Sequence, residues 1–408
     1  MNEDKSKHGL DFLTTIPIEL KTEIFKYLCS HCTSNISDND STRPQPHDHE
    51  SLAKLCLTCR SLRDVAQPIL YHYFWCQKHG PDSTMNSFAW TLNERPHLAG
   101  IIRRVEFLHF DVLPDHESRQ FSVLSALNAH QLAKSLSKIH FMLFDSVLAQ
   151  AINLEELTVT AETWTLPAID FPRLRFLRLN VRHLDIEQQL SGDNMRVRAA
   201  QQIERLWLNT VSEICEYLPN LAPNTQRLTL EIDFPEDAEL EVEELVKGLP
   251  KLTTFELQAM EFGDFRQIDI LSTLLARKDD LTRIGLYIPG ILIDLSRLKG
   301  FSNLKHLRLA GKIQGSEDFE EYLFLLRLES LWIELDVDKP VWLVAQMSER
   351  VSRDDNLKSV KCSRLSDDIP ELQDASWYQN VKTKFEAAGV EFEIVPNCDD
   401  REDYYMFD

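Results

Sequence analysis

The sequence predicts an α/β protein in which three short N-terminal helices precede a long array of parallel strands that alternate with helices. Two observations support this fold class. Apolar residues recur at helical spacing within the first 75 residues, and from residue 154 onward a short apolar segment of period two returns every 20 to 29 residues. A chain of 408 residues with 43% hydrophobic content can form a folded core for each part.

The first predicted helix begins at Pro17. Proline is favoured at the start of a helix because its missing N–H would have no intrahelical partner there. The apolar residues that follow at helical spacing, on one face, are Leu20, Ile24, Tyr27 and Leu28. The pattern predicts a helix with one apolar face.

Two further helices are predicted between residues 50 and 75. The second carries an apolar stripe made of Leu52, Leu55, Cys56, Cys59 and Leu62, and the third opens at Pro68 with Ile69, Leu70 and Tyr73. A helical unit of about 60 residues has only a small core. We therefore expect it to keep apolar side chains on its surface for a partner to cover.

Three sub-motifs in this region resemble the F-box. They are I-P-x-E-L (16–20), E-I-F-x-Y-L (23–28) and L-x-x-L-x-x-T-C-R-x-L (52–62), the last in its fungal form. The polar, proline-containing residues 33–50 lengthen the connection between the first two helices, so we expect a looped-out disordered insertion. The competing interpretation is an ordinary helical cap without a partner.

The resemblance implies a partner and a function. F-box proteins dock on the small adaptor of a cullin-RING (SCF) ubiquitin ligase, while the rest of the chain selects the protein to be ubiquitinated for proteasomal degradation. The residues expected to contact the adaptor are Ile16, Pro17, Leu20, Ile24, Leu28, Leu52, Leu55, Cys59 and Arg60. The partners implied are the adaptor, a cullin reached through it, and a protein substrate.

From residue 100 onward, a segment of the form L-x-x-L-x-L predicts one strand at each recurrence. The instances are VEFLHF (105–110), LEELTV (154–159), LRFLRL (174–179), IERLWL (203–208), TQRLTL (225–230), LTTFEL (252–257), LTRIGL (281–286), LKHLRL (304–309), LESLWI (328–333) and LKSVKC (357–362). The gap between Leu108 and Leu157 spans about two periods, so a degenerate repeat is expected near residues 135–144.

The spacing lies in the range of leucine-rich repeats. Helix-like stretches between the strands are long enough for right-handed crossovers, which would stack the strands in parallel with the helices outside. The repeats lack an asparagine ladder and resemble the degenerate leucine-rich repeats of fungal F-box proteins. A mixed α/β domain without solenoid regularity is the alternative.

These patterns divide the chain into five parts. We expect a flexible N-terminus (1–10), an F-box (11–76) with its insertion (33–50), a helical linker (77–100), a leucine-rich-repeat solenoid (101–396) ending in a capping strand, and an acidic tail (397–408).

In such a solenoid the fifth residue of each motif lines the concave face. These residues are Thr158, Arg178, Trp207, Thr229, Glu256, Gly285, Arg308, Trp332 and Lys361. Large apolar rings are normally buried in the core, and Trp and Arg are enriched in binding hot spots. The expected substrate contacts are Arg178, Trp207, Tyr287, Arg308 and Trp332, where Tyr287 lies two positions further along its strand. Alternatively, these rings pack against each other or under a loop.

The eight cysteines are expected to be reduced thiols. Cys29-x-x-Cys32 and Cys56-x-x-Cys59 resemble paired zinc knuckles. However, Cys56 and Cys59 lie on the apolar stripe, where free cysteine behaves as a small hydrophobe. We therefore expect neither a metal nor a cofactor.

Several function classes are disfavoured. A formal net charge of -21 repels nucleic acid. The sequence contains no Walker loop, G-x-G-x-x-G, H-E-x-x-H or G-x-S-x-G motif, so no enzymatic activity is expected. No segment reaches the roughly 18 consecutive apolar residues of a membrane span, and the polar N-terminus is no signal peptide, which favours the cytoplasm or nucleus.

The sequence thus predicts the substrate-recognition subunit of an SCF ubiquitin ligase. A repeat scaffold that binds a protein partner without ubiquitination is the alternative. A third form, in which the F-box binds its adaptor but never joins a cullin, has the same sequence features.

Overall fold

The computed structural model forms two compact units, residues 1–200 with 400–408 (unit 1) and residues 201–399 (unit 2). The residues it describes are 15–29, 32, 48–77, 84–109, 142–165, 171–185, 202–209, 222–232, 238–259, 269–314, 327–335, 344–345, 347–349, 351, 356–364 and 375–395. The predicted flexible N-terminus, most of the 33–50 insertion and the acidic tail lie outside these residues.

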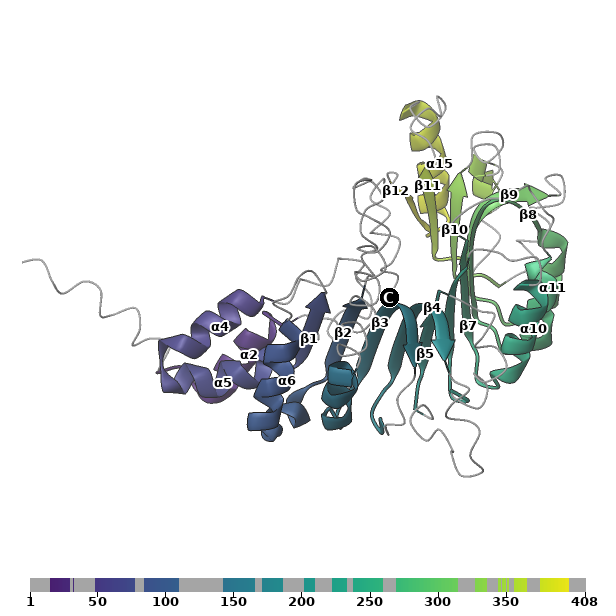
Figure 1. The fold of residues 1–408 in the computed structure, drawn as a ribbon. Helices are drawn as coiled ribbons and strands as arrows, with labels where there is room; N and C mark the ends of the chain where they lie inside the picture. Colours follow the sequence, from purple (N-terminus) through teal and green to yellow (C-terminus); the bar gives the residue numbers. More distant parts are fainter. Residues whose placement is uncertain are drawn as a thin grey trace, which may run out of the picture. The chain divides into compact units, whose positions relative to one another are not determined.

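Unit 1 begins with helices α2 (Ile18–Lys26), α4 (His49–Thr58) and α5 (Arg60–Leu70), drawn in purple and blue in Figure 1. Pro17 is the N-cap of α2, as the sequence pattern predicts for a helix start. Asp48 caps α4, because its side chain accepts a hydrogen bond from the backbone N–H of Ser51 at 2.8 Å.

The boundaries of the second and third helices differ from the prediction. The backbone of Cys59 is extended (φ -157°, ψ 164°), so the predicted second helix divides into α4 and α5 at this residue. Pro68 does not open a helix but lies near the end of α5, where its missing N–H removes one hydrogen bond. Tyr73, predicted to be helical, begins strand β1 (Tyr73–Gln77).

Side chains from all three helices form a small core. Its buried members are Phe25, Cys29, Leu52, Leu62, Val65, Ala66 and Ile69, and Leu28, Cys32, Leu55, Cys56, Cys59 and Leu70 pack partly buried against them. The second-helix stripe of the sequence analysis therefore faces inward.

The sheet of unit 1 contains β1, β2 (Arg104–His109), β3 (Glu156–Thr165) and β4 (Phe176–Asp185). These strands are parallel and follow one another in sequence order. Helix α6 (Thr84–Glu94) and the 3-10 helix η1 (Pro96–Ile101) lie between β1 and β2. They overlap the helical linker that the sequence predicts at residues 77–100.

The described residues of unit 2 form parallel strands β5 to β12, also in sequence order. Figure 1 shows how they are arranged. They are β5 (Arg205–Leu208), β6 (Arg227–Ile232), β7 (Thr254–Ala259), β8 (Arg283–Asp294), β9 (His306–Gln314), β10 (Ser330–Leu335), β11 (Ser359–Arg364) and β12 (Glu391–Val395). The helical segments described between and beside them are α10 (Ala238–Gly248), α11 (Ile270–Leu274), η3 (Leu275–Arg277), η4 (Leu295–Gly300) and α15 (Ala375–Ala387).

The parallel α/β architecture confirms the predicted fold class at this level, and it is compatible with a solenoid. Strands β3 to β11 each begin at the third residue of their motif. Their fourth positions pair in register, for example Leu228 with Phe255 and Phe255 with Ile284. These side chains are fully buried, so the fourth positions form the continuous core that the repeat pattern predicts.

The start of the array differs from the prediction. Val105, not Leu108, pairs with Leu157, so the first motif was placed three residues too late. Strand β2 pairs directly with β3, which leaves no room for a strand of a degenerate repeat between them. Residues 142–144, at the end of the expected repeat, are helical, and residues 135–141 lie outside the described chain.

A backbone hydrogen-bond pattern replaces the missing asparagine ladder. In most of the motifs the carbonyl of the second residue accepts two N–H groups from the next repeat. Thr253 O, for example, accepts from Thr282 N at 2.8 Å and from Arg283 N at 3.2 Å. The carbonyls that share this role belong to Glu155, Glu204, Gln226, Thr253, Thr282, Lys305 and Glu329, and Lys358 O accepts a hydrogen bond from Glu391 N at 2.8 Å. Because a backbone carbonyl makes these bonds, the position accepts any side chain.

Among the described helices, none combines the length and apolar character needed to cross a membrane.

Candidate functional site

Helix α2 carries apolar side chains on two of its sides, and the inward side also holds the buried Lys21. Phe25 and Cys29 point inward and are buried in the helical core. Leu20, Ile24 and Tyr27 recur at i, i+4 and i+7 on another side, where they are 56%, 51% and 61% exposed. A helix that covers a core normally carries polar residues on its outer side. The outer side of α2 therefore has the composition of a contact surface.

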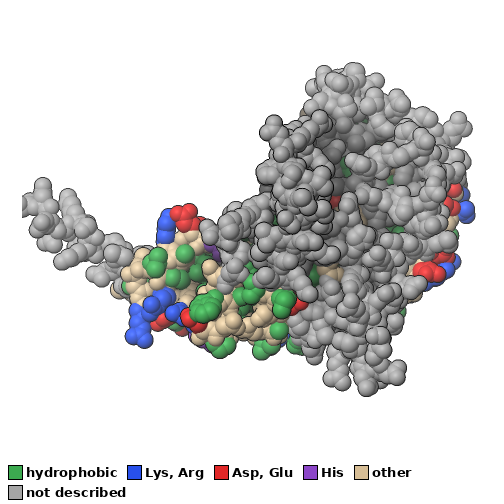
Figure 2. All heavy atoms as spheres, in the orientation of Figure 1, with side chains coloured by type: hydrophobic (Ala, Val, Ile, Leu, Met, Phe, Trp, Pro, Cys, Tyr) green, Lys and Arg blue, Asp and Glu red, His purple; other side chains and the backbone are tan. Residues whose placement is uncertain are grey.

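Further exposed apolar side chains belong to the same helical unit. Ile18 is 58% exposed at the start of α2, and Leu57 is 86% exposed near the end of α4. We call Leu20, Ile24 and Tyr27 the α2 stripe. In Figure 2, hydrophobic side chains gather on the visible face of the helical part at the left of the view, beside basic and acidic ones.

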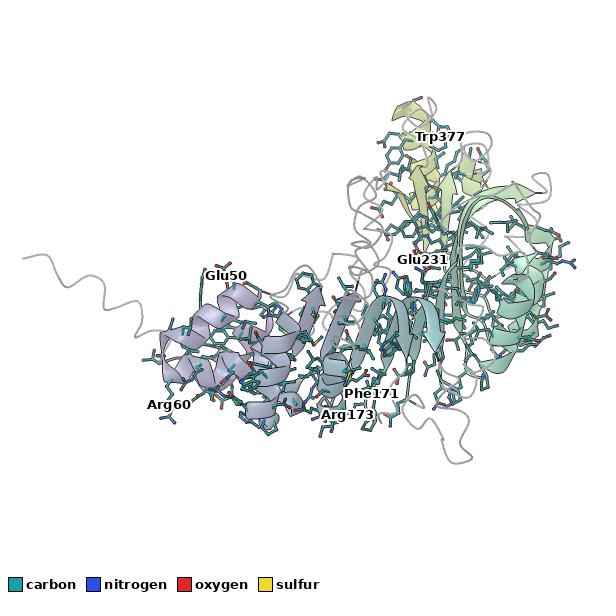
Figure 3. The ribbon with its side chains drawn as sticks, in the orientation of Figure 1. Glu50, Arg60, Phe171, Arg173, Glu231 and Trp377 are labelled. Atoms are coloured by element: carbon teal, nitrogen blue, oxygen red, sulfur yellow. The ribbon has the colours of Figure 1, made fainter. Side chains whose placement is uncertain are left out.

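The residues predicted to bind the adaptor divide between surface and core. Pro17, Leu20, Ile24 and Arg60 are exposed and Ile16 is half-buried. Arg60 points away from the helices (Figure 3). Four others support the surface from within, since Leu28, Leu55 and Cys59 pack partly buried against the core and Leu52 is 0% exposed.

The exposed residues Ile18, Tyr27 and Leu57 were not among the predicted adaptor contacts. Tyr27 was assigned to an apolar helix face, but not to the surface. Ile18 and Leu57 adjoin motif positions that were assigned, but the motif itself gives them no role. Helical periodicity groups Tyr27 with Leu20 and Ile24 without saying which side of the helix is buried. The signal available was the presence of two apolar sides on one helix.

The second surface lies on the strands of unit 2. The third, fifth and seventh motif residues share one face of the sheet, which we call the odd-position face. On it the guanidinium of Arg308 lies 4.1 Å from the ring centre of Trp332 on the neighbouring strand. Tyr287 lies one strand further, opposite Ala310. The structure thus brings three of the five predicted substrate contacts onto adjacent strands.

The other two predicted contacts lie elsewhere. Trp207 is on β5, three strands from Tyr287, and only 7% exposed, so it offers little surface to a partner. Arg178 belongs to β4 in unit 1. The fifth-position row is less solvated than expected, because Thr158 and Thr229 are each 8% exposed. Side chains about 4.8 Å apart on neighbouring strands cover one another.

An ion pair organises the middle of the odd-position face. Arg227 binds Glu256 with an Nη2–Oε1 distance of 3.1 Å, and the hydroxyl of Thr229 donates to the same carboxylate at 3.3 Å. Burial first, then the charge of Arg227, lowers the pKa of Arg283. A Cβ on Gly285 would lie 3.1 Å from Glu256 Cγ, so glycine leaves room for this carboxylate.

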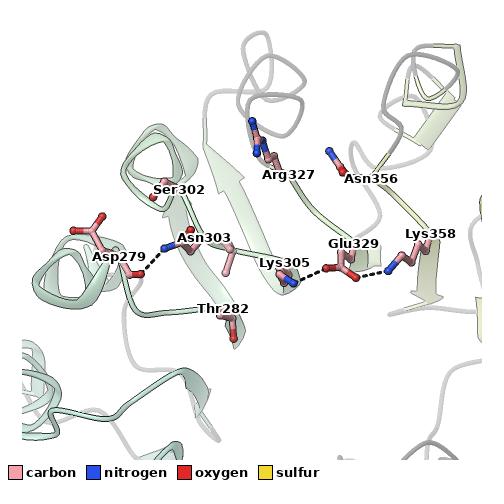
Figure 4. A pocket seen from close by; sticks show the side chains of 10 residues that line it. Asp279, Thr282, Ser302, Asn303, Lys305, Arg327, Glu329, Asn356 and Lys358 are labelled. Atoms are coloured by element: carbon pink, nitrogen blue, oxygen red, sulfur yellow. Dashed lines mark hydrogen bonds and ion pairs between the residues drawn. The ribbon is translucent and has the colours of Figure 1, made fainter.

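A polar hollow of ≈ 480 Å³ lies where strands β8 to β11 begin (Figure 4). Glu329 sits between two lysines, 2.9 Å from Lys305 Nζ and 2.5 Å from Lys358 Nζ. The hydrogen bonds from Lys358 and Lys305 lower the pKa of Glu329 to about 2. The described residues that line the hollow are polar or charged apart from Leu304, and none of them is a histidine.

Unit 1 holds a half-buried ionic cluster on its first three strands. The hydroxyl of Tyr73 donates to Glu106 at 2.6 Å, and Arg104 contacts both Glu106 at 2.5 Å and Glu156 at 3.4 Å. Burial, followed by the charge of Glu106, raises the pKa of Tyr73 far above its usual range. Each of these polar groups has a partner, so the cluster is a structural one.

One group of potential metal ligands is present among the described residues. Atoms of Cys29, Cys32 and His72 lie within 4.8 Å of one another. Cys56 and Cys59 are not part of this group and pack against the helical core instead. The two Cys-x-x-Cys pairs considered from the sequence therefore do not come together as one site. Cys29 and Cys32 lie beside His72 instead.

Comparison with known proteins adds no assignment. No protein-family model matches this chain, and no curated protein matches its sequence.

Proposed function

We propose that this chain is the substrate-recognition subunit of an SCF (cullin-RING) ubiquitin ligase. In this proposal α2, α4 and α5 form an F-box that docks on the adaptor, and degenerate leucine-rich repeats bind the target protein. Catalysis is left to other subunits. The chain then acts by raising the effective concentration of substrate lysines near the ubiquitin-charged enzyme.

The observation that supports docking most strongly is the α2 stripe. Its side chains are half-exposed although the helix has already provided Phe25 to the core. Fully burying an exposed Leu, Ile or Phe side chain contributes about 1.5–3 kcal/mol of binding free energy, so covering the half-exposed Leu20 and Ile24 would contribute about half of that each. A partner that covers the stripe therefore gains binding free energy.

Substrate binding is proposed for the odd-position face of β8 to β10. Tyr287, Arg308 and Trp332 are of residue types enriched in hot spots, and they lie on adjacent strands. The guanidinium stacked on Trp332 is already ordered, which lowers the entropy that a partner must overcome. The face is therefore suited to a protein segment that packs an apolar or aromatic side chain against Tyr287 and Trp332.

The experiment is co-purification of the full chain with a fungal SCF adaptor and its cullin. We expect the double variant Leu20→Asp, Ile24→Asp to lose the adaptor, because each aspartate places a charge in the buried contact. Ile152→Asp is the matched control, since Ile152 is equally exposed at 59% but lies outside the helical unit. The control should bind as the unchanged chain does.

Three outcomes separate the candidate functions. Recovery of adaptor and cullin supports the ligase subunit, and recovery of adaptor without cullin supports the form that never joins a ligase. If the unchanged chain and both variants fail equally to bind the adaptor, the ligase proposal is wrong and the protein-binding scaffold replaces it.

A further inference from the structure

Three metal-binding side chains converge where α2 ends and α5 leads into β1. The sulfur atoms of Cys29 and Cys32 and a ring nitrogen of His72 all lie within 4.8 Å of one another. Cys32 Sγ is 3.3 Å from His72 Nδ1, although the two residues are 40 positions apart in sequence. Cys29 is fully buried, while Cys32 and His72 are half-buried.

The backbone holds two of these residues in place. The N–H of Cys29 donates to Lys26 O at 3.0 Å as α2 ends. The carbonyl of His72 accepts hydrogen bonds from Arg103 N and Arg104 N, both at 2.9 Å, so the start of β2 fixes it. The positions of Cys29 and His72 therefore follow from helix and strand geometry.

The arrangement fits the dimensions of a zinc site. With Zn–S distances of about 2.3 Å and Zn–N distances of about 2.1 Å, a tetrahedral ion places two sulfurs about 3.8 Å apart and a sulfur about 3.6 Å from a nitrogen. Donors within 4.8 Å reach this geometry through shifts of about 1 Å or less. The Cys-x-x-Cys spacing is that of a zinc knuckle, and two thiolates with one imidazole favour Zn²⁺ over Mg²⁺ or Ca²⁺.

We propose that Cys29, Cys32 and His72 bind one Zn²⁺ ion with water in the fourth position. The ion ties the end of α2 to the junction between α5 and β1. Two S–H bonds are replaced by two Zn–S bonds, two protons are released to solvent, and no electron transfer is involved. This site is independent of the proposed function, because none of its ligands belongs to the α2 stripe.

The first measurement is the zinc content of the full chain. The protein is purified in the presence of a phosphine reductant, equilibrated with Zn²⁺, dialysed and measured by mass spectrometry of the metal. We expect one zinc per chain. Replacement by Co²⁺ should give a thiolate-to-cobalt charge-transfer absorption, which reports sulfur ligands directly.

Matched variants assign the ligands. Cys32→Ser and His72→Gln alter half-buried positions, and each should weaken binding at least tenfold and reduce the cobalt absorption. Cys56→Ser is the control, since Cys56 is also half-buried but lies outside the cluster. It should bind zinc as the unchanged chain does. Circular dichroism verifies that each variant is folded, and if Cys32→Ser is not, His72→Gln decides alone.

The proposal is overturned by any of three results. The first is a chain without zinc that also gives no cobalt absorption. The second is zinc binding that survives both Cys32→Ser and His72→Gln, and the third is equal loss of zinc in Cys56→Ser. As a separate readout, a chelator should lower the melting temperature of the unchanged chain but not that of His72→Gln.

Discussion

The carboxyl group of Asp145 couples the stability of unit 1 to pH. Asp145 lies in the helical segment 142–150, and its Oδ1 is buried without a hydrogen-bond partner in the described part of the chain. Burial raises its pKa from 3.8 to about 6. Because the folded-state pKa lies above the unfolded value, the unfolded chain releases this proton first. The contribution of Asp145 to stability is therefore greatest below pH 4 and falls as pH rises to about 6.

We predict that Asp145→Asn stabilises the protein at pH 7. The gain should be about 1 kcal/mol after allowance for the solvent that still reaches this side chain. Urea denaturation at several pH values between 4 and 7 measures it, and the variant should show a smaller fall in stability across this range. Asp64→Asn, at an exposed aspartate, is the control. Equal stability of Asp145→Asn and the unchanged chain at pH 7 would contradict the prediction.

The Arg308–Trp332 pair is the residue-scale test of the proposed substrate surface. We predict that Trp332→Ala weakens substrate binding by about 2 kcal/mol or more, which is roughly 30-fold, because it removes both the ring and the support for the guanidinium. Quantitative affinity capture measures the recovered proteins. Trp90→Ala, at a tryptophan that is 67% exposed in unit 1, is the control. If the amount of captured protein falls equally in both variants, the loss reflects less folded chain and not a lost substrate contact.

At the scale of elements, the N-cap of α11 joins two helical segments of unit 2. Asp269 accepts a hydrogen bond from the N–H of Ser272 at 3.1 Å and pairs with Arg297 of η4 at 3.3 Å. The helix itself has only five residues, too few for intrinsic stability, so its conformation depends on the cap and on packing.

We therefore predict that Asp269→Ala lowers the free energy of unfolding of unit 2 by about 1–2 kcal/mol. Chemical denaturation followed by circular dichroism measures the change. Asp279→Ala is the comparison, because Asp279 is exposed and its backbone carbonyl, not its carboxylate, accepts the hydrogen bond from Asn303. A loss of similar size in both variants would argue against a capping role.

The elements also show which parts of the structure a sequence pattern can locate. The L-x-x-L-x-L motif placed strands β3 to β11, because alternate burial imposes a period of two that other structures do not share. Strand β1 has the sequence YFWCQ without this motif, and its first tyrosine continued a helical spacing from Ile69 and Leu70. A long-range pairing with β2 decides its conformation, and such pairing leaves no local signal.

The candidate site was predictable only in part, because local periodicity groups residues on one side of a helix without saying which side is buried. Helical periodicity assigned Leu20 and Ile24 to one side of α2, but it could not tell that Leu52 would be core and Tyr27 surface. Two sides of α2 carry apolar side chains, and only the packing of α4 and α5 distinguishes them. The cluster of Cys29, Cys32 and His72 required the fold, because His72 is brought to the cysteines by the junction between α5 and β1.

At the scale of the whole molecule, the described strands within each unit pair with their neighbours in sequence order. Stability in such an array is approximately a sum of local terms, so a defect at one end need not reach the other. The C-terminal end is held by α15, whose Phe385 is 0% exposed and stacks on Phe392 of β12 with ring centres 5.0 Å apart. In unit 1 the corresponding contact is Phe107 on β2 against Phe144, at 4.2 Å.

We predict that Phe385→Ala, which removes about 3–5 kcal/mol of packing, raises amide hydrogen exchange in β10 to β12 and leaves β1 to β4 unchanged. Phe107→Ala is the reciprocal variant and should raise exchange in β1 to β3 alone. Hydrogen-exchange mass spectrometry measures both on the full chain. If either variant raises exchange equally in both units, the array unfolds as one cooperative body. Local unfolding would instead allow unit 2 to open while helices α2, α4 and α5 of unit 1 stay folded.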